Sequence, residues 1–283
     1  MLKIATVATH NDGYLPALKR ICEKNKCHLD IIGFRQKWGG WDWRTNKIIN
    51  YLQKCKMSDI VMLIDGFDVL VLSKPEEIIE KFKKMSCNVL FSCSHISRGQ
   101  PNNDSFTYKN IAFPSVKKYF KSKKDFILNA GTIIGYSKHL LQLYLQIQKQ
   151  QKIRGINDDQ ILLNSMNLSF LKYNIDFDSN IFWIWEIDRI IDYGNMLITN
   201  ETYSSSTTRY KHGRIVFSNG NQPCVVHGVN NRNMNEICIR NNVYLLDYKP
   251  KEIQQKDLRN MIQRTRWLLY LLPLIYFTGK LLK

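Results

Sequence analysis

Short apolar runs rich in β-branched residues alternate with helix-like segments through the first half of this 283-residue chain. The runs predict strands at residues 2–9, 28–34, 60–64 and 88–92. Helices are expected at residues 15–24, 44–55 and 76–85, the last after a capping box formed by Ser73 and Glu76. This alternation predicts an α/β fold with a mostly parallel sheet flanked by helices. In such sheets ligands bind beyond the carboxyl ends of the strands.

The second half is less regular, and it ends in a segment of different composition. Residues 126–136 are apolar and contain glycine, and helices are expected at 137–151 and from about Asn157. Short strands are expected at residues 181–185, 215–217 and 224–226. No strong linker interrupts the chain before residue 248. We therefore expect one domain over residues 1–248 and a C-terminal helical, apolar-ended extension over residues 249–283.

The extension ends in an apolar stretch over residues 267–277, which Pro273 interrupts. It is shorter than the ~20 residues that cross a bilayer, so no full-length transmembrane segment is expected. Upstream basic residues and interfacial aromatic residues favour binding to a membrane surface. The alternative, a final helix packed on the chain's own core, stays open.

The chain has a formal net charge of +17 and seven cysteines. A basic surface attracts anions such as nucleotide diphosphates, acidic glycans, phospholipid surfaces and nucleic acids. No nucleic-acid-binding motif accompanies the charge, so no nucleic acid is expected as a partner. The cysteines are odd in number and scattered without a CxxC motif, which is typical of reduced, buried thiols. The first residues indicate a core strand and no signal peptide, so the expected location is cytoplasmic or peripheral to a membrane.

Two carboxylates, Asp65 and Asp68, follow the apolar strand at residues 60–64. Carboxylate ligands suit a hard divalent cation such as Mn²⁺ or Mg²⁺, and such a cation can neutralise a diphosphate leaving group. The alternative is that both are ordinary turn acids, which often follow strands.

Two further motifs each have a plain structural interpretation. Residues 128–136 (LNAGTIIGY) contain glycines that would let the backbone approach a ligand closely, and residues 157–160 read NDDQ. Asn157 and Gln160 match a capping box, and acids there favour a helix start. An imidazole, His227, ends an apolar strand and precedes Gly228; a lone histidine there is often structural.

Taken in order, the four motifs resemble one family. The acids Asp65 and Asp68 after a strand, then LNAG with IGY, then DDQ, then VHG are similar to the glycosyltransferase domain of procollagen lysyl hydroxylases and related collagen glycosyltransferases. The resemblance extends over about residues 2–231. It implies a GT-A-like fold with a Rossmann-type, mostly parallel sheet. It also implies a UDP-sugar donor, a hydroxyl-bearing protein or glycan acceptor, and Mn²⁺ or Mg²⁺.

The resemblance also implies roles for single residues. Asp65, Asp68 and His227 match the metal ligands, while Asp158 and Asp159 match the acids of the sugar and acceptor side, where we expect the catalytic residues. The donor-binding residues expected from the same comparison are Phe67, near uracil, Lys47, Asn129, Gly131, Gly228 and, from a tryptophan-rich segment, Trp41. Stacking of Trp41 on a ligand and simple packing are equally open readings.

Two departures from the family pattern bear on specificity. The last motif continues as Val229-Asn230 where the family has Asn-Gly, and residues 94–100 stand where the family has a Trp-Pro pair. The expected function is a metal-dependent glycosyltransferase that moves a hexose or pentose from a UDP-sugar to a hydroxyl. The alternatives are a catalytically silent UDP-sugar-binding protein and a basic nucleic-acid-binding protein.

Overall fold

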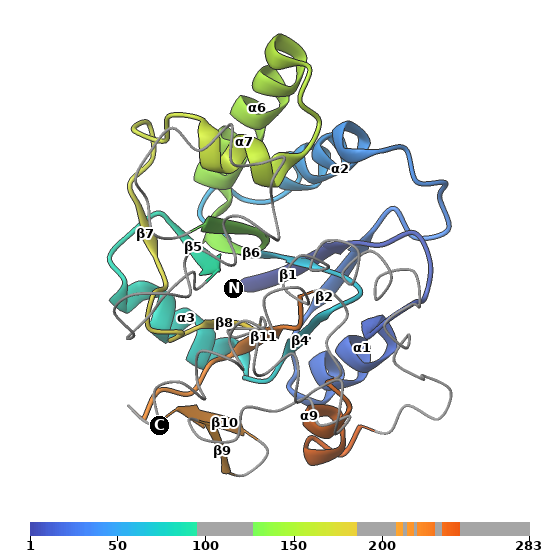
Figure 1. Ribbon diagram of the computed structural model, residues 1–283, viewed down its shortest axis with the longest axis vertical. Coiled ribbons are helices and arrows are strands. Elements are labelled where there is room, and N and C mark those ends of the chain that lie inside the picture. Colours follow the sequence, from blue (N-terminus) through green and yellow to red (C-terminus); the bar gives the residue numbers. More distant parts are fainter. Residues whose placement is uncertain (95–126, 186–207, 212–213, 218–219, 230–233, 244–283) are drawn as a thin grey trace, which may run out of the picture. The chain divides into compact units, whose positions relative to one another are not determined.

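A computed structural model describes residues 1–94, 127–185, 208–211, 214–217, 220–229 and 234–243 (Figure 1). The chain divides into two units, Met1–Tyr248 and Lys249–Lys283. The second unit lies outside the described residues, so the C-terminal helix and its membrane role stay predictions.

A six-stranded sheet forms the centre of the first unit, in the order β2-β1-β3-β6-β5-β7. Strand β1 is parallel to β2 and β3, β7 is parallel to β5, and β6 is antiparallel to both β3 and β5. The predicted α/β fold with a mostly parallel sheet is therefore confirmed, with β6 as its reversed strand. The bounds are β1 Leu2–Val7, β2 Leu29–Ile32, β3 Ile60–Asp65, β5 Val89–Ser94, β6 Ile127–Tyr136 and β7 Tyr173–Ile175.

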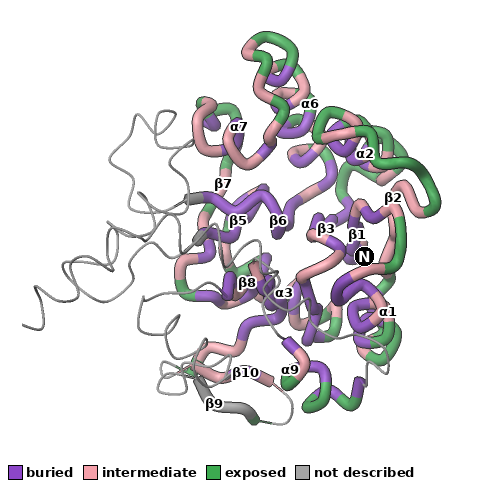
Figure 2. Tube along the Cα trace, turned by 45° about the vertical axis from the view of Figure 1, so that its right-hand side comes forward, coloured by how far each residue is buried: buried purple, intermediate pink, exposed green. Residues whose placement is uncertain are grey.

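Helices lie on both faces of this sheet (Figure 1). On one face pack α2 (Trp41–Gln53), α6 (Ser137–Arg154) and α7 (Asp159–Ser165); on the other pack α1 (Leu15–Lys24) and α3 (Pro75–Lys84). The side chains of β3 alternate between the two cores: Met62 joins the second set of helices and Leu63 the first. This alternation explains why β3 is apolar from Ile60 to Ile64, since both faces of that stretch are buried. Figure 2 shows the central strands in the buried colour and much of edge strand β2 as intermediate.

A second, three-stranded sheet lies on the face of α1 and α3. It consists of β4 (Val69–Val71), β11 (Val225–His227) and β8 (Phe182–Ile184), with β11 in the middle, antiparallel to β4 and parallel to β8. Strands β9 (Thr208–Lys211) and β10 (Arg214–Phe217) pair antiparallel, and α9 covers Asn235–Arg240. The apolar residues of this sheet also point alternately into two cores.

The capping box predicted before α3 is wrong. The helix α3 begins at Pro75 after an N-cap at Lys74, and no side-chain hydrogen bond caps it, so Ser73 and Glu76 form no capping box. Pro75 explains the difference, because proline lacks an N–H and its fixed φ suits the first position of a helix.

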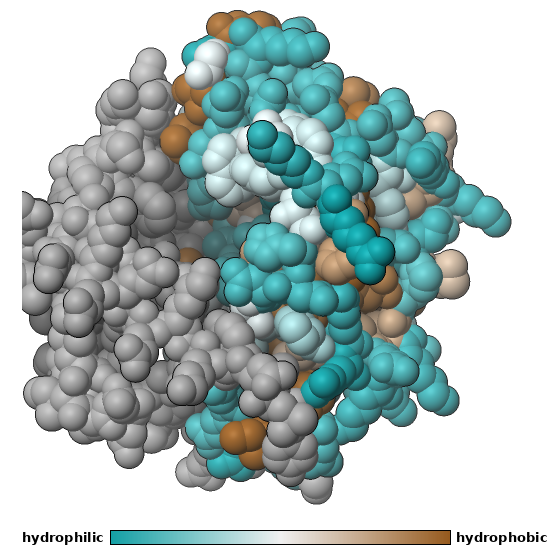
Figure 3. Space-filling model, turned by 90° about the vertical axis from the view of Figure 1, so that its right-hand side faces the viewer, coloured by the Kyte–Doolittle hydropathy of each residue, from teal (hydrophilic) through white to brown (hydrophobic). Residues whose placement is uncertain are grey.

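The described surface is rich in polar side chains, and the cysteines are free, as the charged residues and the scattered cysteines of the sequence predict. The coloured part of the face in Figure 3 is mostly hydrophilic with small hydrophobic patches. All seven cysteines lie in the described part; none forms a disulfide, and six are buried. None of the helices in the described ranges has the length and apolarity that a bilayer crossing requires.

Candidate metal centre

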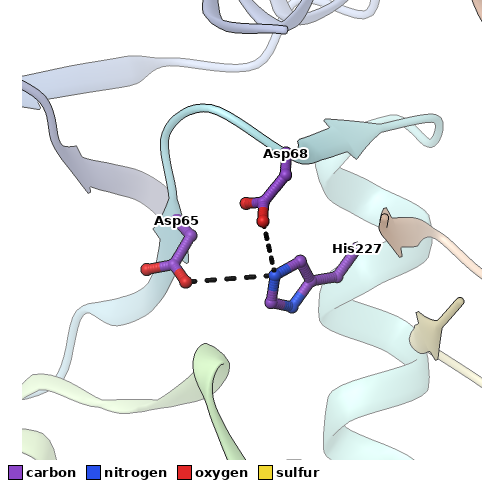
Figure 4. A group of neighbouring side chains, drawn as sticks. All are labelled: Asp65, Asp68 and His227. Atoms are coloured by element: carbon purple, nitrogen blue, oxygen red, sulfur yellow. Dashed lines mark ion pairs between the residues drawn. The ribbon is translucent and has the colours of Figure 1, made fainter. Parts of the chain in front are cut away.

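The two acids of the first motif lie where the six-stranded sheet passes into the three-stranded one. Asp65 is the last residue of β3, and Asp68 directly precedes β4. Figure 4 shows the short turn between them, with one oxygen of each carboxylate facing the ring of His227. Asp65 has a side chain that is 39% exposed and Asp68 one that is 22% exposed, so both can reach a ligand from solvent.

The third group, His227, is the last residue of β11 and is buried. The antiparallel register pairs His227 with Val69, the residue after Asp68, and the Gly228 N–H donates to the Asp68 carbonyl oxygen at 2.7 Å. The imidazole Nε2 therefore lies 3.3 Å from Asp68 Oδ2 and 3.9 Å from Asp65 Oδ2 (Figure 4). Sheet pairing thus brings together residues from distant parts of the sequence.

The three side chains fit a divalent cation. Each offers one ligand atom, and these atoms all lie within 4.8 Å of one another. Two carboxylates and an imidazole form a donor set that suits Mn²⁺. Gly131 of β6 leaves the space beside them open, because a Cβ there would lie 2.5 Å from Asp65 Oδ2 and nearer still to His227 Cε1.

The glycine is held there by an interaction between β6 and α7. The side chain of Gln160 accepts the Ala130 N–H at 2.6 Å and donates to the Leu128 carbonyl oxygen at 2.7 Å, while Asn129 Oδ1 accepts the Gly131 N–H at 2.8 Å. The LNAG and DDQ motifs therefore form one unit. Gln160 takes no part in a capping box with Asn157, which corrects that expectation.

A buried ion-pair network continues from Asp65 into the helices. Arg44 of α2 donates from Nη2 to Asp65 Oδ1 at 2.9 Å and from Nη1 to Asp159 Oδ2. Burial would lower the pKa of Arg44, but the charges of Asp159 and Asp65 outweigh burial and raise this pKa, so the guanidinium stays protonated. Burial raises the pKa of Asp159, and the charge of Arg44 opposes that rise.

Asp158, the neighbour of Asp159, has a different environment. It is half-buried and is the N-cap of α7, where its Oδ1 accepts the Ile161 N–H at 3.1 Å. The expectation that acids favour this helix start is met by Asp158 in its cap position. The structure therefore separates the two acids: one caps a helix and the other forms an ion pair with Arg44.

The other predicted donor-side residues have different surroundings. Phe67 occupies the turn between the two acids, with its ring 5.3 Å from that of His10. Lys47 places its Nζ 5.4 Å from the Trp43 ring centroid, and Trp41 is 46% exposed, with the Arg44 guanidinium carbon 5.9 Å from its ring centroid.

Arg44 is the functional candidate that the sequence analysis did not single out. It shares the apolar face of α2 with Ile48 and Leu52, four and eight residues later, and all three are buried. A charged residue that lies four and eight residues before apolar ones falls on the buried face of its helix. A buried charge needs a partner of opposite charge. That spacing is the signal that could have identified it.

The comparisons with known proteins agree with the four motifs. A family model described as the PLOD GT domain matches residues 1–240. The human multifunctional procollagen lysine hydroxylase and glycosyltransferase LH3 is 27% identical over 199 residues, which cover 64% of this chain and 24% of that protein. The procollagen-lysine,2-oxoglutarate 5-dioxygenase of Drosophila melanogaster is 24% identical over 196 residues, covering 64% of this chain and 25% of that protein. The chain thus matches about a quarter of the length of these relatives.

Among solved structures, a glycosyltransferase involved in the glycosylation of the major capsid of PBCV-1 is 10% identical, with a TM-score of 0.48. The match covers 85% of this chain and 97% of that one. A TM-score this low marks only a loose correspondence. The family model, in contrast, covers most of the chain and confirms the resemblance seen in the motifs. The protein therefore belongs to the PLOD GT domain family.

Proposed function

We propose that this chain is a metal-dependent glycosyltransferase that moves a sugar from a UDP-sugar to an acceptor hydroxyl. The observation that carries the proposal is the meeting of Asp65, Asp68 and His227 beside Gly131. These residues would hold Mn²⁺, or Mg²⁺ in its place. A cation bound there would offset the negative charge of the departing diphosphate.

The chain's own residues would orient the donor around that centre. Phe67 lies in the turn that carries both acids, which suits contact with uracil, and Asn129 and Gly228 stay donor-side candidates because they adjoin the group through Gly131 and Asp68. Lys47 and Trp41 lie on α2, the helix that contributes Arg44, and they are proposed for the outer part of the donor site.

On the acceptor side, transfer breaks the bond between the anomeric carbon and the phosphate oxygen and forms one to the acceptor oxygen. The acceptor hydroxyl loses its proton, and Asp158 and Asp159 are the acids proposed to orient the sugar or accept that proton. Asp159 is 3% exposed and already bound to Arg44, so Asp158 is the more accessible of the two. The acceptor proposed is a protein or glycan hydroxyl, including collagen-like hydroxylysine.

The metal site is tested by calorimetric titration of Mn²⁺ into the wild type and into Asp68→Ala and His227→Ala. Each variant removes one ligand, so Mn²⁺ affinity should fall by at least about tenfold while the fold is kept. Glu80→Gln is the matched control, since it removes an exposed carboxylate of α3 and should bind Mn²⁺ normally. Wild-type affinity in Asp68→Ala would rule out the metal assignment.

The reaction is tested by measuring UDP release with Mn²⁺ across UDP-hexoses, UDP-xylose and UDP-N-acetylhexosamines. Release from at least one donor, and none after chelation, is expected. A protein that binds UDP in the presence of Mn²⁺ but releases none from any donor would be a silent UDP-sugar-binding protein instead.

A further inference from the structure

Arg44 is a buried cation that connects the two parts of the site. It is 6% exposed and lies on the core face of α2. One guanidinium nitrogen binds Asp65 at the end of β3, and the other binds Asp159 at the start of α7. A buried arginine must be paired to offset the loss of hydration, and here both partners are carboxylates that the site uses.

The two oxygens of Asp65 have different partners. Oδ1 accepts from Arg44 Nη2 at 2.9 Å, whereas Oδ2 faces His227 Nε2 at 3.9 Å. The hydrogen bond to Oδ1 therefore limits rotation of the carboxylate about its terminal bond. That restraint keeps Oδ2 among the candidate metal ligands.

Arg44 is also restrained where it binds Asp159. Asp159 is 3% exposed, and buried Tyr144 of α6 lies close enough to Arg44 to interact with it. Gln151 of α6 provides a second connection between α2 and the start of α7. Its Nε2 donates to Thr45 Oγ1, next to Arg44 in the sequence, and to the Asn157 carbonyl oxygen, just before α7. The guanidinium is thus held by Asp65 of β3, Asp159 of α7 and Tyr144 of α6.

We propose that Arg44 is a positioning residue that sets the distance and orientation between the metal-side carboxylate of Asp65 and the sugar-side acid Asp159. This proposal rests on the proposed function. The arginine contacts neither the metal nor the reacting atoms, and it acts through the two acids. Arginine suits the role because its planar fork can bind two carboxylates at once in fixed directions, whereas lysine offers a point charge.

Arg44→Lys tests the proposal because it keeps the charge and removes the fork. We expect Mn²⁺ affinity, measured by calorimetry without donor, to fall by ~10–100-fold, the effect typical of losing a group that orients a metal ligand. At saturating Mn²⁺, kcat of donor hydrolysis should fall by a similar factor, while KM changes less. The melting temperature without metal should stay within a few degrees of the wild type.

A second variant addresses the charge itself. Arg44→Gln combined with Asp159→Asn replaces the ion pair by two neutral amides and leaves the net charge of the site unchanged. Its fold should be kept because no buried charge remains unpaired at that end of the bridge. Mn²⁺ affinity should fall as in Arg44→Lys, since Asp65 has lost its orienting donor.

The matched control is Arg214→Lys. Arg214 binds Glu77 with both terminal nitrogens, at 2.8 and 3.0 Å, between β10 and α3, and it shares no partner with Arg44. This control should lose thermal stability and keep Mn²⁺ affinity and kcat. A variant of Arg44 with the same behaviour, or Arg44 variants that all fail to fold, would make Arg44 a residue of stability alone and overturn the proposal.

Failure of this inference is distinguishable from failure of the proposed function. If Asp68→Ala binds Mn²⁺ as the wild type does, the metal site itself is wrong. If Asp68→Ala loses Mn²⁺ but Arg44→Lys and the double variant both bind it normally, only the role of Arg44 is wrong.

Discussion

At the scale of single residues, the candidate centre depends as much on a missing side chain as on the three that are present. Gly131 faces Asp65 and His227 so closely that any Cβ would occupy the space between them and Asn129. Gly131 has no positive φ, so the need for glycine here comes from space and not from backbone conformation.

Gly131→Ala should therefore remove Mn²⁺ binding while the sheet stays folded. The added methyl group must displace His227 or Asp65, and a displacement of a few tenths of an ångström disrupts a ligand set. Calorimetry with Mn²⁺ and a melting curve check this together.

Gly155→Ala is the matched control for that variant. Gly155 ends α6 with φ +63° and has open space around its Cβ position, so alanine there should cost about 1–2 kcal/mol of stability. Its Mn²⁺ affinity should be unchanged. If Gly131→Ala binds Mn²⁺ normally, the cation does not bind beside β6.

The sequence identified the members of this centre unevenly. Asp65, Asp68 and His227 stood out because each follows an apolar strand in a motif, and the structure brings them together. Their role as ligands stays a prediction. Arg44 did not stand out, because a basic residue on a helix is usually solvated. Its spacing with Ile48 and Leu52 indicates the buried face of the helix, but only tertiary packing shows which carboxylates it binds.

At the scale of elements, the start of α7 allows capping and catalysis to be separated. Asp158→Ser keeps a capping oxygen, whereas Asp158→Ala removes it at a cost of about 1 kcal/mol. If Asp158 acts on the substrate, both variants should lose sugar transfer and only Asp158→Ala should lose stability. Melting curves and a transfer assay check this, and normal transfer by Asp158→Ser would reduce Asp158 to a helix cap.

The ion pair between α3 and β10 predicts a stability change at acidic pH. Burial would raise the pKa of Glu77, but Arg214 and Lys81 outweigh it and lower the pKa from 4.5 to about 2. A carboxylate with a depressed pKa stabilises the fold above its ordinary pKa, and this contribution disappears as the pH falls from about 4.5 toward 2.

Glu77→Gln should therefore lower the melting temperature at pH 7 by about 2–4 °C, on the order of 1 kcal/mol for this partly exposed group. The difference from the wild type should shrink as the pH falls through that interval. Glu80→Gln, with its exposed pair to Lys84, should show little change at any pH. A difference for Glu77→Gln that stays constant down to pH 2 would contradict the ion-pair explanation.

Most elements were predicted within a few residues, namely the strands β1, β2, β3, β5, β8, β10 and β11 and the helices α1, α2, α3, α6 and α7. Strands β4, β7 and β9 and the helix α9 were missed. Three to six residues carry little periodicity, so short elements are predicted in some places and missed in others. The reversal of β6 was also not visible, because strand direction depends on the partner and leaves no pattern in the strand itself.

At the scale of the whole molecule, the sequence of residues 249–283 predicts membrane-surface binding, outside the described residues. Full-length protein should float with anionic liposomes and not with neutral ones, because Lys256, Arg259, Arg264 and Arg266 precede an apolar end rich in interfacial aromatics. A chain truncated after Lys251 should stay folded and active but no longer float. A large fall in melting temperature on truncation, with no flotation of the full-length protein, would show that this segment packs on the domain.

The register between β4 and β11 has a consequence for how the protein is made. Asp65 and Asp68 leave the ribosome early, whereas His227 follows only after most of the first unit has been synthesised. The pairing of β11 with β4 closes a long loop, and contacts between residues so far apart in the sequence form slowly. During translation, therefore, a nascent chain has the acids long before it has the imidazole, and it gains the complete set of candidate cation ligands only when β11 has docked. Mn²⁺ affinity would then serve as a reporter of completed folding.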